Sequence, residues 1–215
     1  MTPDSVLKNN AKISLHGNWK LSIAIAVLVM YTSPFILFAA ENLAVLFRKF
    51  SAVILTVEPI AAFLLSSVFA LGTASLFLSI SSNKYVDFEN FFSAFENMFK
   101  AIVLNFLIYL FVTLWSLLLF IPGIIASYKY KLAFYILSES PELSPFDAIK
   151  ISKRMTYGNK MRLFKFDLSF IGWFILCAIS GGIAGIYVIP YYNTALSNLY
   201  KELKMEYIDK ANSFE

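Results

Sequence analysis

Long apolar runs constrain the fold of this chain more than any other feature. Runs of about 20 residues recur at 21–40, 59–80, 101–121 and 166–189. A helix rises about 1.5 Å per residue, so each run is long enough to cross a hydrocarbon core about 30 Å thick. A buried soluble core would not need four of them. The sequence therefore predicts an all-α, polytopic membrane protein.

Composition supports lipid as the solvent for most of the chain. Hydrophobic residues make up 59% of the sequence and charged residues 15%, whereas a soluble domain is about half apolar and about a quarter charged. The run 21–40 is followed by others and lacks the compact basic head and the small-residue cleavage site of a signal peptide. We therefore expect it to be a retained signal anchor.

Basic residues gather between the apolar runs, as the positive-inside rule requires of cytoplasmic segments. The strongest cluster lies between Glu139 and Lys165. The rule accounts for the net charge of +4 without a nucleic-acid partner. We predict six transmembrane helices arranged as three in-out-in hairpins, with both termini cytoplasmic and the lipid bilayer as the main partner; a homo-oligomer or a membrane protein partner stays open.

Each hairpin is preceded by an amphipathic stretch that we expect to lie at the cytoplasmic interface. The first ends at Gly17-Asn18, the second begins at Asp87 with phenylalanines at helical spacing, and the third begins at Ser144-Pro145 and ends at Gly158-Asn159. Residues 41–57 are predicted to form an outer surface helix. Four further boundaries are predicted: Glu58-Pro59 opens the second span, Pro122-Gly123 turns the chain, Gly181-Gly182 breaks the last run, and a charged tail follows from Lys201.

The chain is predicted to be a single membrane domain, 1–215, with pseudo-repeats at 1–80, 86–138 and 144–203. The second and third repeats align without gaps at an offset of 62, which pairs Asn97 with Asn159, Lys100 with Arg162 and Asn105 with Asp167. The three units share one orientation, so the repeat is parallel rather than inverted.

Several motifs in the second half of the chain resemble a bacterial integral-membrane family. They are Ile121-Pro122-Gly123, the stretch from Ile124 to Tyr135, the segment from Ser144-Pro145 to Gly158-Asn159, Asp167 to Trp173, and Pro190-Tyr191-Tyr192. The family is the domain-of-unknown-function family nine-seven-five, common in Firmicutes, and the motifs cover roughly residues 85–203. The resemblance implies a polytopic plasma-membrane protein of Gram-positive type and brings no activity with it.

Ionisable groups inside apolar runs are costly, so each is a candidate binding residue. Lys129 and Lys131 would form a basic site for an anion or a lipid headgroup, lined by Tyr128, Tyr130 and Tyr135. Snorkelling and ion pairing are the alternative. Asp167 would pair with Arg162, Lys165 or Lys131, or serve a proton-coupled carrier. Glu58 would cap a helix N-terminus or pair with Lys129.

The sequence offers no catalytic constellation. The only histidine, His16, lies beside a helix end in the N-terminal segment, and the only cysteine, Cys177, lies inside an apolar run. We therefore expect neither a Cys-His dyad nor a zinc site. We expect no catalytic residues, no metal and no cofactor.

Three function hypotheses remain, and a non-enzymatic transport or permeation protein is the leading one, because parallel hairpins and buried charges are a known transporter design. An accessory or protective protein that binds a peptide or a partner complex is the alternative. A lipid-acting intramembrane enzyme is the third.

Overall fold

The computed structural model describes residues 2–84 and 86–212, and these residues form helices and turns with no strand. This confirms the all-α prediction. The α-helices are α1 Asp4–Leu15, α2 Trp19–Leu46, α3 Ser51–Ser81, α4 Phe88–Phe92, α5 Met98–Leu118, α6 Phe120–Tyr130, α7 Ala133–Glu139, α8 Pro145–Met155, α9 Lys160–Leu168, α10 Ile171–Ile179 and α11 Gly185–Asn212. Two short 3₁₀ helices, Arg48–Phe50 and Ser93–Asn97, join α2 to α3 and α4 to α5.

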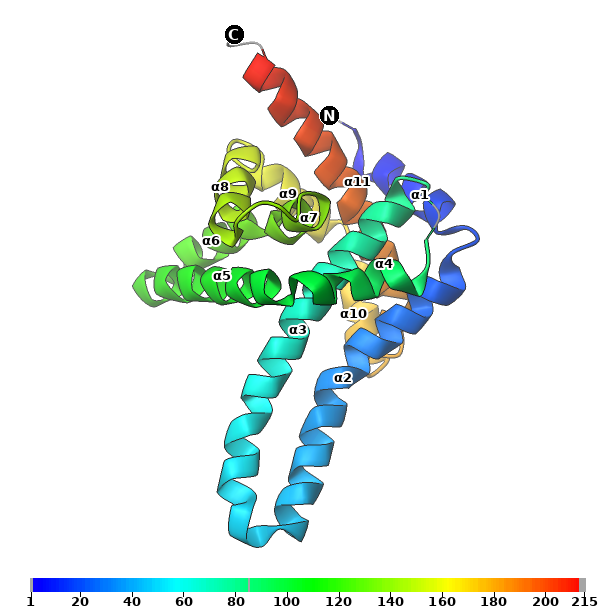
Figure 1. Cartoon of the computed structure of the whole chain (residues 1–215). Coiled ribbons are helices and arrows are strands. Elements are labelled where there is room, and N and C mark those ends of the chain that lie inside the picture. The colour runs from blue at the N-terminus through cyan, green and yellow to red at the C-terminus, as the bar shows by residue number, and fades with distance from the viewer. Residues whose placement is uncertain (1, 85, 213–215) are drawn as a thin grey trace.

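Helices α2 and α3 form a long hairpin that projects from the rest of the molecule (Figure 1). The predicted surface helix at 41–57 is wrong, because α2 continues to Leu46 and α3 already begins at Ser51. Glu58-Pro59 consequently lies inside α3 and does not open it. In an apolar environment the backbone N–H and C=O groups must be hydrogen-bonded within the segment, and an uninterrupted helix achieves this. That requirement outweighs the preference of proline for the first turn of a helix.

Three helical stretches of the described residues are long and apolar enough to cross a membrane: Trp19–Leu46, Arg48–Ser81 and Phe88–Leu118. These stretches indicate a membrane-associated protein. The helices α6, α7, α9 and α10 have 11, 7, 9 and 9 residues, each too short to span about 30 Å. The count of six spans therefore stays a prediction.

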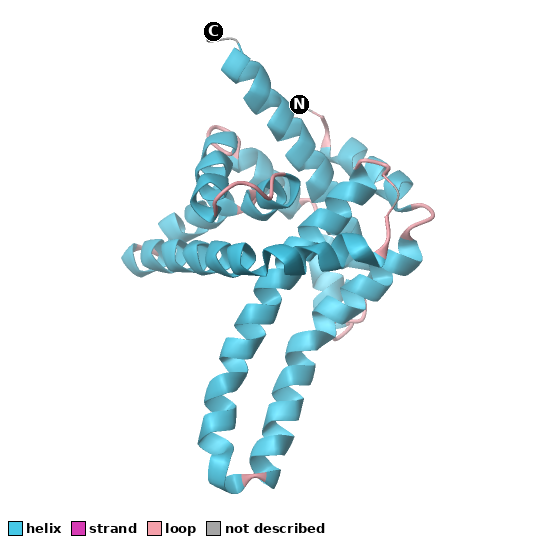
Figure 2. Ribbon diagram, in the orientation of Figure 1, coloured by secondary structure: helices cyan, strands magenta, loops and turns pink. Residues whose placement is uncertain are grey.

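The second hairpin, α5 with α6, points in a different direction from α2–α3 (Figures 1 and 2). Its turn is Leu119, which is extended, so the prediction that Pro122-Gly123 makes the turn is wrong. Pro122 sits instead in the first turn of α6, where its missing N–H costs nothing. Gly123 allows the two helices to touch, since a Cβ there would overlap the Ser116 hydroxyl.

The local signals for helix ends are mostly confirmed. Asp87 and Asn90 form a capping box at α4, and Ser144 caps α8. Gly17 and Gly158 adopt φ of +90° and +81° beyond the ends of α1 and α8, a conformation that favours glycine. The segment from Lys201 to Asn212, predicted as a tail, is the end of α11.

The core gathers around α3, which contacts α1, α2, α4, α5, α7 and α11. Phe91 of α4 is fully buried against Gly72 of α3, whereas Phe88 and Phe92 remain exposed. Phe91 therefore anchors the second amphipathic stretch to α3. Both termini lie at the end of the molecule opposite the tip of α2–α3 (Figure 1).

Candidate functional site: a lysine–aspartate pair beside a polar cavity

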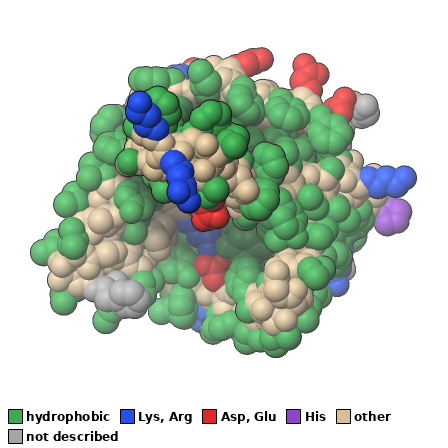
Figure 3. All heavy atoms as spheres, turned by 90° about the horizontal axis from the view of Figure 1, so that it is seen from below, with side chains coloured by type: hydrophobic (Ala, Val, Ile, Leu, Met, Phe, Trp, Pro, Cys, Tyr) green, Lys and Arg blue, Asp and Glu red, His purple; other side chains and the backbone are tan. Residues whose placement is uncertain are grey.

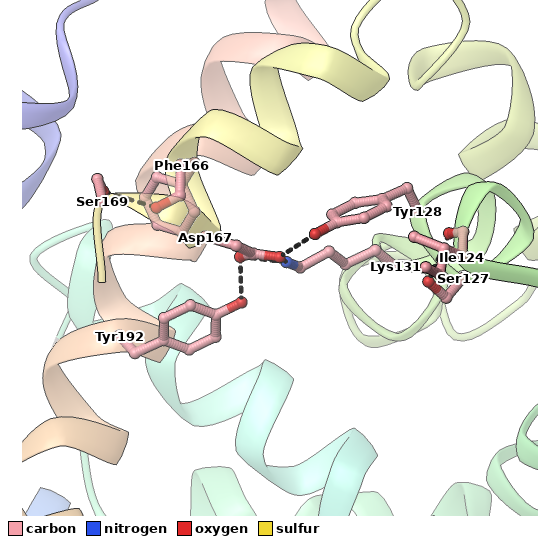
Figure 4. Close-up of polar contacts among 8 residues, drawn as sticks. All are labelled: Ile124, Ser127, Tyr128, Lys131, Phe166, Asp167, Ser169 and Tyr192. Atoms are coloured by element: carbon pink, nitrogen blue, oxygen red, sulfur yellow. Dashed lines mark hydrogen bonds and ion pairs between the residues drawn. The ribbon is translucent and has the colours of Figure 1, made fainter. Parts of the chain in front are cut away.

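Asp167 is the centre of a polar cluster that joins three parts of the chain. Lys131 Nζ lies 2.5 Å from both Asp167 carboxylate oxygens. The Tyr128 hydroxyl donates to Oδ2 at 2.9 Å and the Tyr192 hydroxyl to Oδ1 at 2.8 Å. Figure 4 shows the three donors converging on the carboxylate. Each oxygen thus accepts a hydrogen bond from the lysine and one from a tyrosine.

Local chain geometry brings these groups together. Lys131 follows the last residue of α6, where the helix breaks before α7 begins at Ala133. Asp167 lies in the last turn of α9, and Tyr192 lies on α11 two residues after Pro190. Phe166, next to Asp167, is fully buried and packs on Phe170 and Tyr192, with ring centroids 5.3 Å and 5.8 Å away. This aromatic packing fixes the end of α9.

The cluster is shielded but not sealed. The side chains of Lys131 and Asp167 are 17% and 23% exposed. Lys131 Nζ also lies 5.2 Å from the centroid of the Tyr128 ring and 5.5 Å from that of Tyr192, so the tyrosines stabilise the cation as well as the carboxylate. The attraction between the Lys131 ammonium and the Asp167 carboxylate offsets much of the free energy needed to remove both ions from water.

Lys131 also borders a cavity of about 330 Å³ between α2, α3, α7 and α11. Hydroxyl, amide and ammonium groups line it together with apolar side chains: Val29, Thr32, Ser33, Ser66, Phe69, Ala70, Thr73, Ala74, Lys131, Phe134, Tyr135, Asn193 and Leu196. Within the described residues the buried Thr73 hydroxyl has no hydrogen-bond partner. Viewed from below, the molecule is hollowed, with basic and acidic side chains among hydrophobic ones (Figure 3).

The other residues predicted for this site lie elsewhere. Lys129 faces away from the cavity, with its Nζ 5.1 Å from the centroid of the Trp115 ring. Tyr130 is buried against Phe111. Glu58 lies inside α3, so the prediction that it caps a helix start is wrong. The structure therefore unites Tyr128, Lys131 and Asp167 and separates them from the rest.

Sequence reasoning missed Tyr192 and the residues of α2, α3 and α11 that line the cavity. Tyr192 belongs to the Pro190-Tyr191-Tyr192 motif, but nothing in its neighbourhood marks it as a partner of Asp167. Arg162, a predicted partner of Asp167, instead pairs with Asp4 of α1. That pair ties α9 to the N-terminal helix, and of the three predicted cations Lys131 is the one that pairs with Asp167.

Residues 117–206 match the family described as "Protein of unknown function (DUF975)". This match covers less than half of the chain. The DUF975 segment contains Tyr128, Lys131, Asp167 and Tyr192, whereas the cavity residues from α2 and α3 precede it. No curated protein and no solved structure gives a significant match to the chain.

The hydrogen bonds of the cluster determine which groups remain available to the cavity. Asp167 accepts hydrogen bonds from Lys131, Tyr128 and Tyr192. Among the described residues no group of three or more histidine, cysteine, aspartate or glutamate side chains could hold a metal ion. Lys131 donates to two oxygens and has three hydrogens, which leaves one for a group in the cavity.

Proposed function

We propose that this protein is a non-enzymatic, multi-pass plasma-membrane protein that mediates permeation of a small polar solute or ion through the cavity beside Lys131. One observation carries the proposal: among the described residues Lys131 is the one charged side chain that lines this cavity, and Asp167 and two tyrosines hold it there. Intramembrane ionisable groups mark substrate and ion pathways.

The cavity lining indicates what kind of solute would fit. A volume of about 330 Å³ lies at the lower end of the usual range for small-molecule sites. Lys131, Asn193 and the unpartnered Thr73 hydroxyl all offer hydrogen-bond donors. These groups favour a solute that accepts hydrogen bonds, such as a small carboxylate.

The proposed topology has six spans and both termini in the cytoplasm of a bacterial cell. The position of both termini at one end of the molecule supports an even number of crossings (Figure 1). Asn105 of α5 donates to Ser67 of α3 at 2.9 Å, and Asp167 of α9 binds Lys131 after α6. Each contact joins a hairpin to the preceding one, and Asn105 and Asp167 are aligned in the predicted repeat.

Proteoliposome swelling tests the proposal. Vesicles with and without protein are exposed to inward gradients of sodium acetate, sodium phosphate and glycerol, and the swelling rate is followed by light scattering. We expect faster uptake of at least one solute with the protein. Thr73→Leu should reduce the gain because it narrows the cavity and removes a hydroxyl from its lining, whereas Thr56→Leu, in the exposed part of α3, should not. Equal rates in protein and protein-free vesicles for all probes would refute permeation.

A further inference from the structure

Three lysines gather on the opposite side of α6 from the cavity without an acidic partner. Lys129 lies at the end of α6, Lys153 on α8 and Lys160 at the start of α9. Lys153 follows Ser152, whose hydroxyl donates to the Lys129 carbonyl, and the charges of Lys153 and Lys160 both act on the Lys129 ammonium. In the part of the chain that the structure describes, none of the three forms an ion pair. Like charges so close together repel one another unless an anion lies between them.

The backbone holds this cluster in place. Helix α6 contacts both α8 and α9. The Ser152 hydroxyl donates to the Lys129 carbonyl at 2.8 Å, and Tyr128 packs edge-on against Phe164 with ring centroids 6.2 Å apart. The lysines therefore do not meet through flexible side chains alone, because the helices that carry them are packed together.

An apolar groove begins where the lysine cluster ends. It has a volume of about 540 Å³ and is lined by Phe111, Leu114, Trp115, Leu117 and Leu118 of α5. Trp115 belongs to both features, since its ring lies 5.1 Å from Lys129 Nζ. Leu117 and Leu118 are 78% and 71% exposed, so the groove is open from outside.

We infer that this surface binds one anionic phospholipid, with its phosphate among Lys129, Lys153 and Lys160 and an acyl chain in the groove along α5. Charge complementarity selects the headgroup, because each lysine near a membrane surface attracts an anionic lipid. The apolar groove selects a lipid over a soluble phosphate. Tryptophan is well suited to the junction, since its ring is apolar and favours the interface. The lipid site does not depend on the permeation function, because the cavity lies on another side of α6.

Quenching of Trp115 fluorescence tests this site directly. The chain has three tryptophans, so the full-length variant Trp19→Phe/Trp173→Phe reports on Trp115 alone. It is reconstituted in phosphatidylcholine bilayers that contain increasing fractions of either dibrominated phosphatidylglycerol or dibrominated phosphatidylcholine. The bromines quench on contact, so the two titrations give the relative affinity for the anionic lipid.

We expect phosphatidylglycerol to quench Trp115 at fractions at least tenfold lower than phosphatidylcholine. Lys129→Gln, Lys153→Gln and Lys160→Gln should each reduce this preference about fivefold. Lys20→Gln, which removes an exposed charge at the start of α2, is the matched control and should leave it unchanged. Helical circular dichroism and gel filtration establish that each variant is folded.

Three results would overturn the inference. Equal quenching by the two lipids would exclude headgroup selection, and this comparison needs no lysine variant. If Lys20→Gln and Lys129→Gln lost the preference for phosphatidylglycerol equally, the preference would be due to the overall surface charge and not to this site. Loss of the preference in millimolar glycerol 3-phosphate would assign the lysines to a soluble phosphate ester instead of a lipid.

Discussion

Lys131 and Asp167 are 36 residues apart, and the Lys131 ammonium lies 2.5 Å from both oxygens of the Asp167 carboxylate. The pair joins the break between α6 and α7 to the end of α9. It thereby connects the α5–α6 hairpin to α9 at the edge of the cavity.

Breaking this pair from either side should have unequal effects. Asp167→Asn leaves the Lys131 ammonium shielded and unpaired, and should cost about 3 kcal/mol of stability. Lys131→Met leaves Asp167 with the hydrogen bonds of Tyr128 and Tyr192 and should cost less. The double variant should be more stable than the sum of the two losses predicts. Thermal unfolding in detergent measures all three, and strict additivity would show that the two charges do not interact.

The tyrosines around Asp167 should contribute through their hydroxyl groups. Tyr192→Phe removes a hydrogen bond to a charged acceptor and should lower stability by about 1.5 kcal/mol. Tyr130→Phe is the control, because Tyr130 is buried whereas Tyr192 is partly buried, and the Tyr130 hydroxyl makes no hydrogen bond within the described residues. The midpoints of thermal unfolding should differ between the two variants; identical midpoints would mean that the Tyr192 hydroxyl is not a stabilising donor.

Short-range signals predict the helix ends well, and long-range contacts explain most of the errors. The capping residues Asp87 and Ser144 and the glycines at 17 and 158 act within one turn of chain, so the sequence reveals them. Whether Glu58-Pro59 begins a helix depends instead on the backbone conformation of the residues that precede it. Those residues, 51–57, remain helical in α3, and the local proline signal is overridden.

The sequence predicts the candidate site only in part, again because long-range contacts decide which side chains meet. Lys131 is one of three cations that the sequence offers to Asp167, and the structure pairs it with Asp167 while Arg162 pairs with Asp4. The expectation that Lys129 shares its site is wrong, because residues two apart do not share a helix face. Helical periodicity alone separates the lysine of the cavity from the lysine of the proposed lipid site. Tyr192 comes from a helix distant in sequence, so no local pattern could have placed it.

Glu139 should make stability sensitive to acid. Burial alone would raise its pKa, but hydrogen bonds from Lys204 and Tyr200 outweigh burial and lower the pKa below its usual 4.5. A carboxyl group with a lowered pKa in the folded state contributes stability above its unfolded pKa, and this contribution is lost as the pH falls through the folded value. The wild-type protein should therefore be more stable than Glu139→Gln at neutral pH. The difference should disappear well below pH 4.5, and thermal unfolding from neutral to acid pH measures it. A pH-independent difference would contradict the pKa shift.

Gly123 should be essential for the contact between α5 and α6. A Cβ at this position would overlap Ser116 Oγ and lie 2.9 Å from Ser116 Cα, so backbone as well as side chain must move. Gly123→Ala should cost about 1–3 kcal/mol, the usual effect of overpacking, and Ser116→Gly should rescue it in part. A Cβ at Gly172 of α10 would meet no atom within 4 Å, so Gly172→Ala should be neutral or stabilising because alanine favours a helix. Chemical denaturation of the three variants checks this order, and equal stability of Gly123→Ala and Gly172→Ala would mean that α5 and α6 do not pack closely at Ser116.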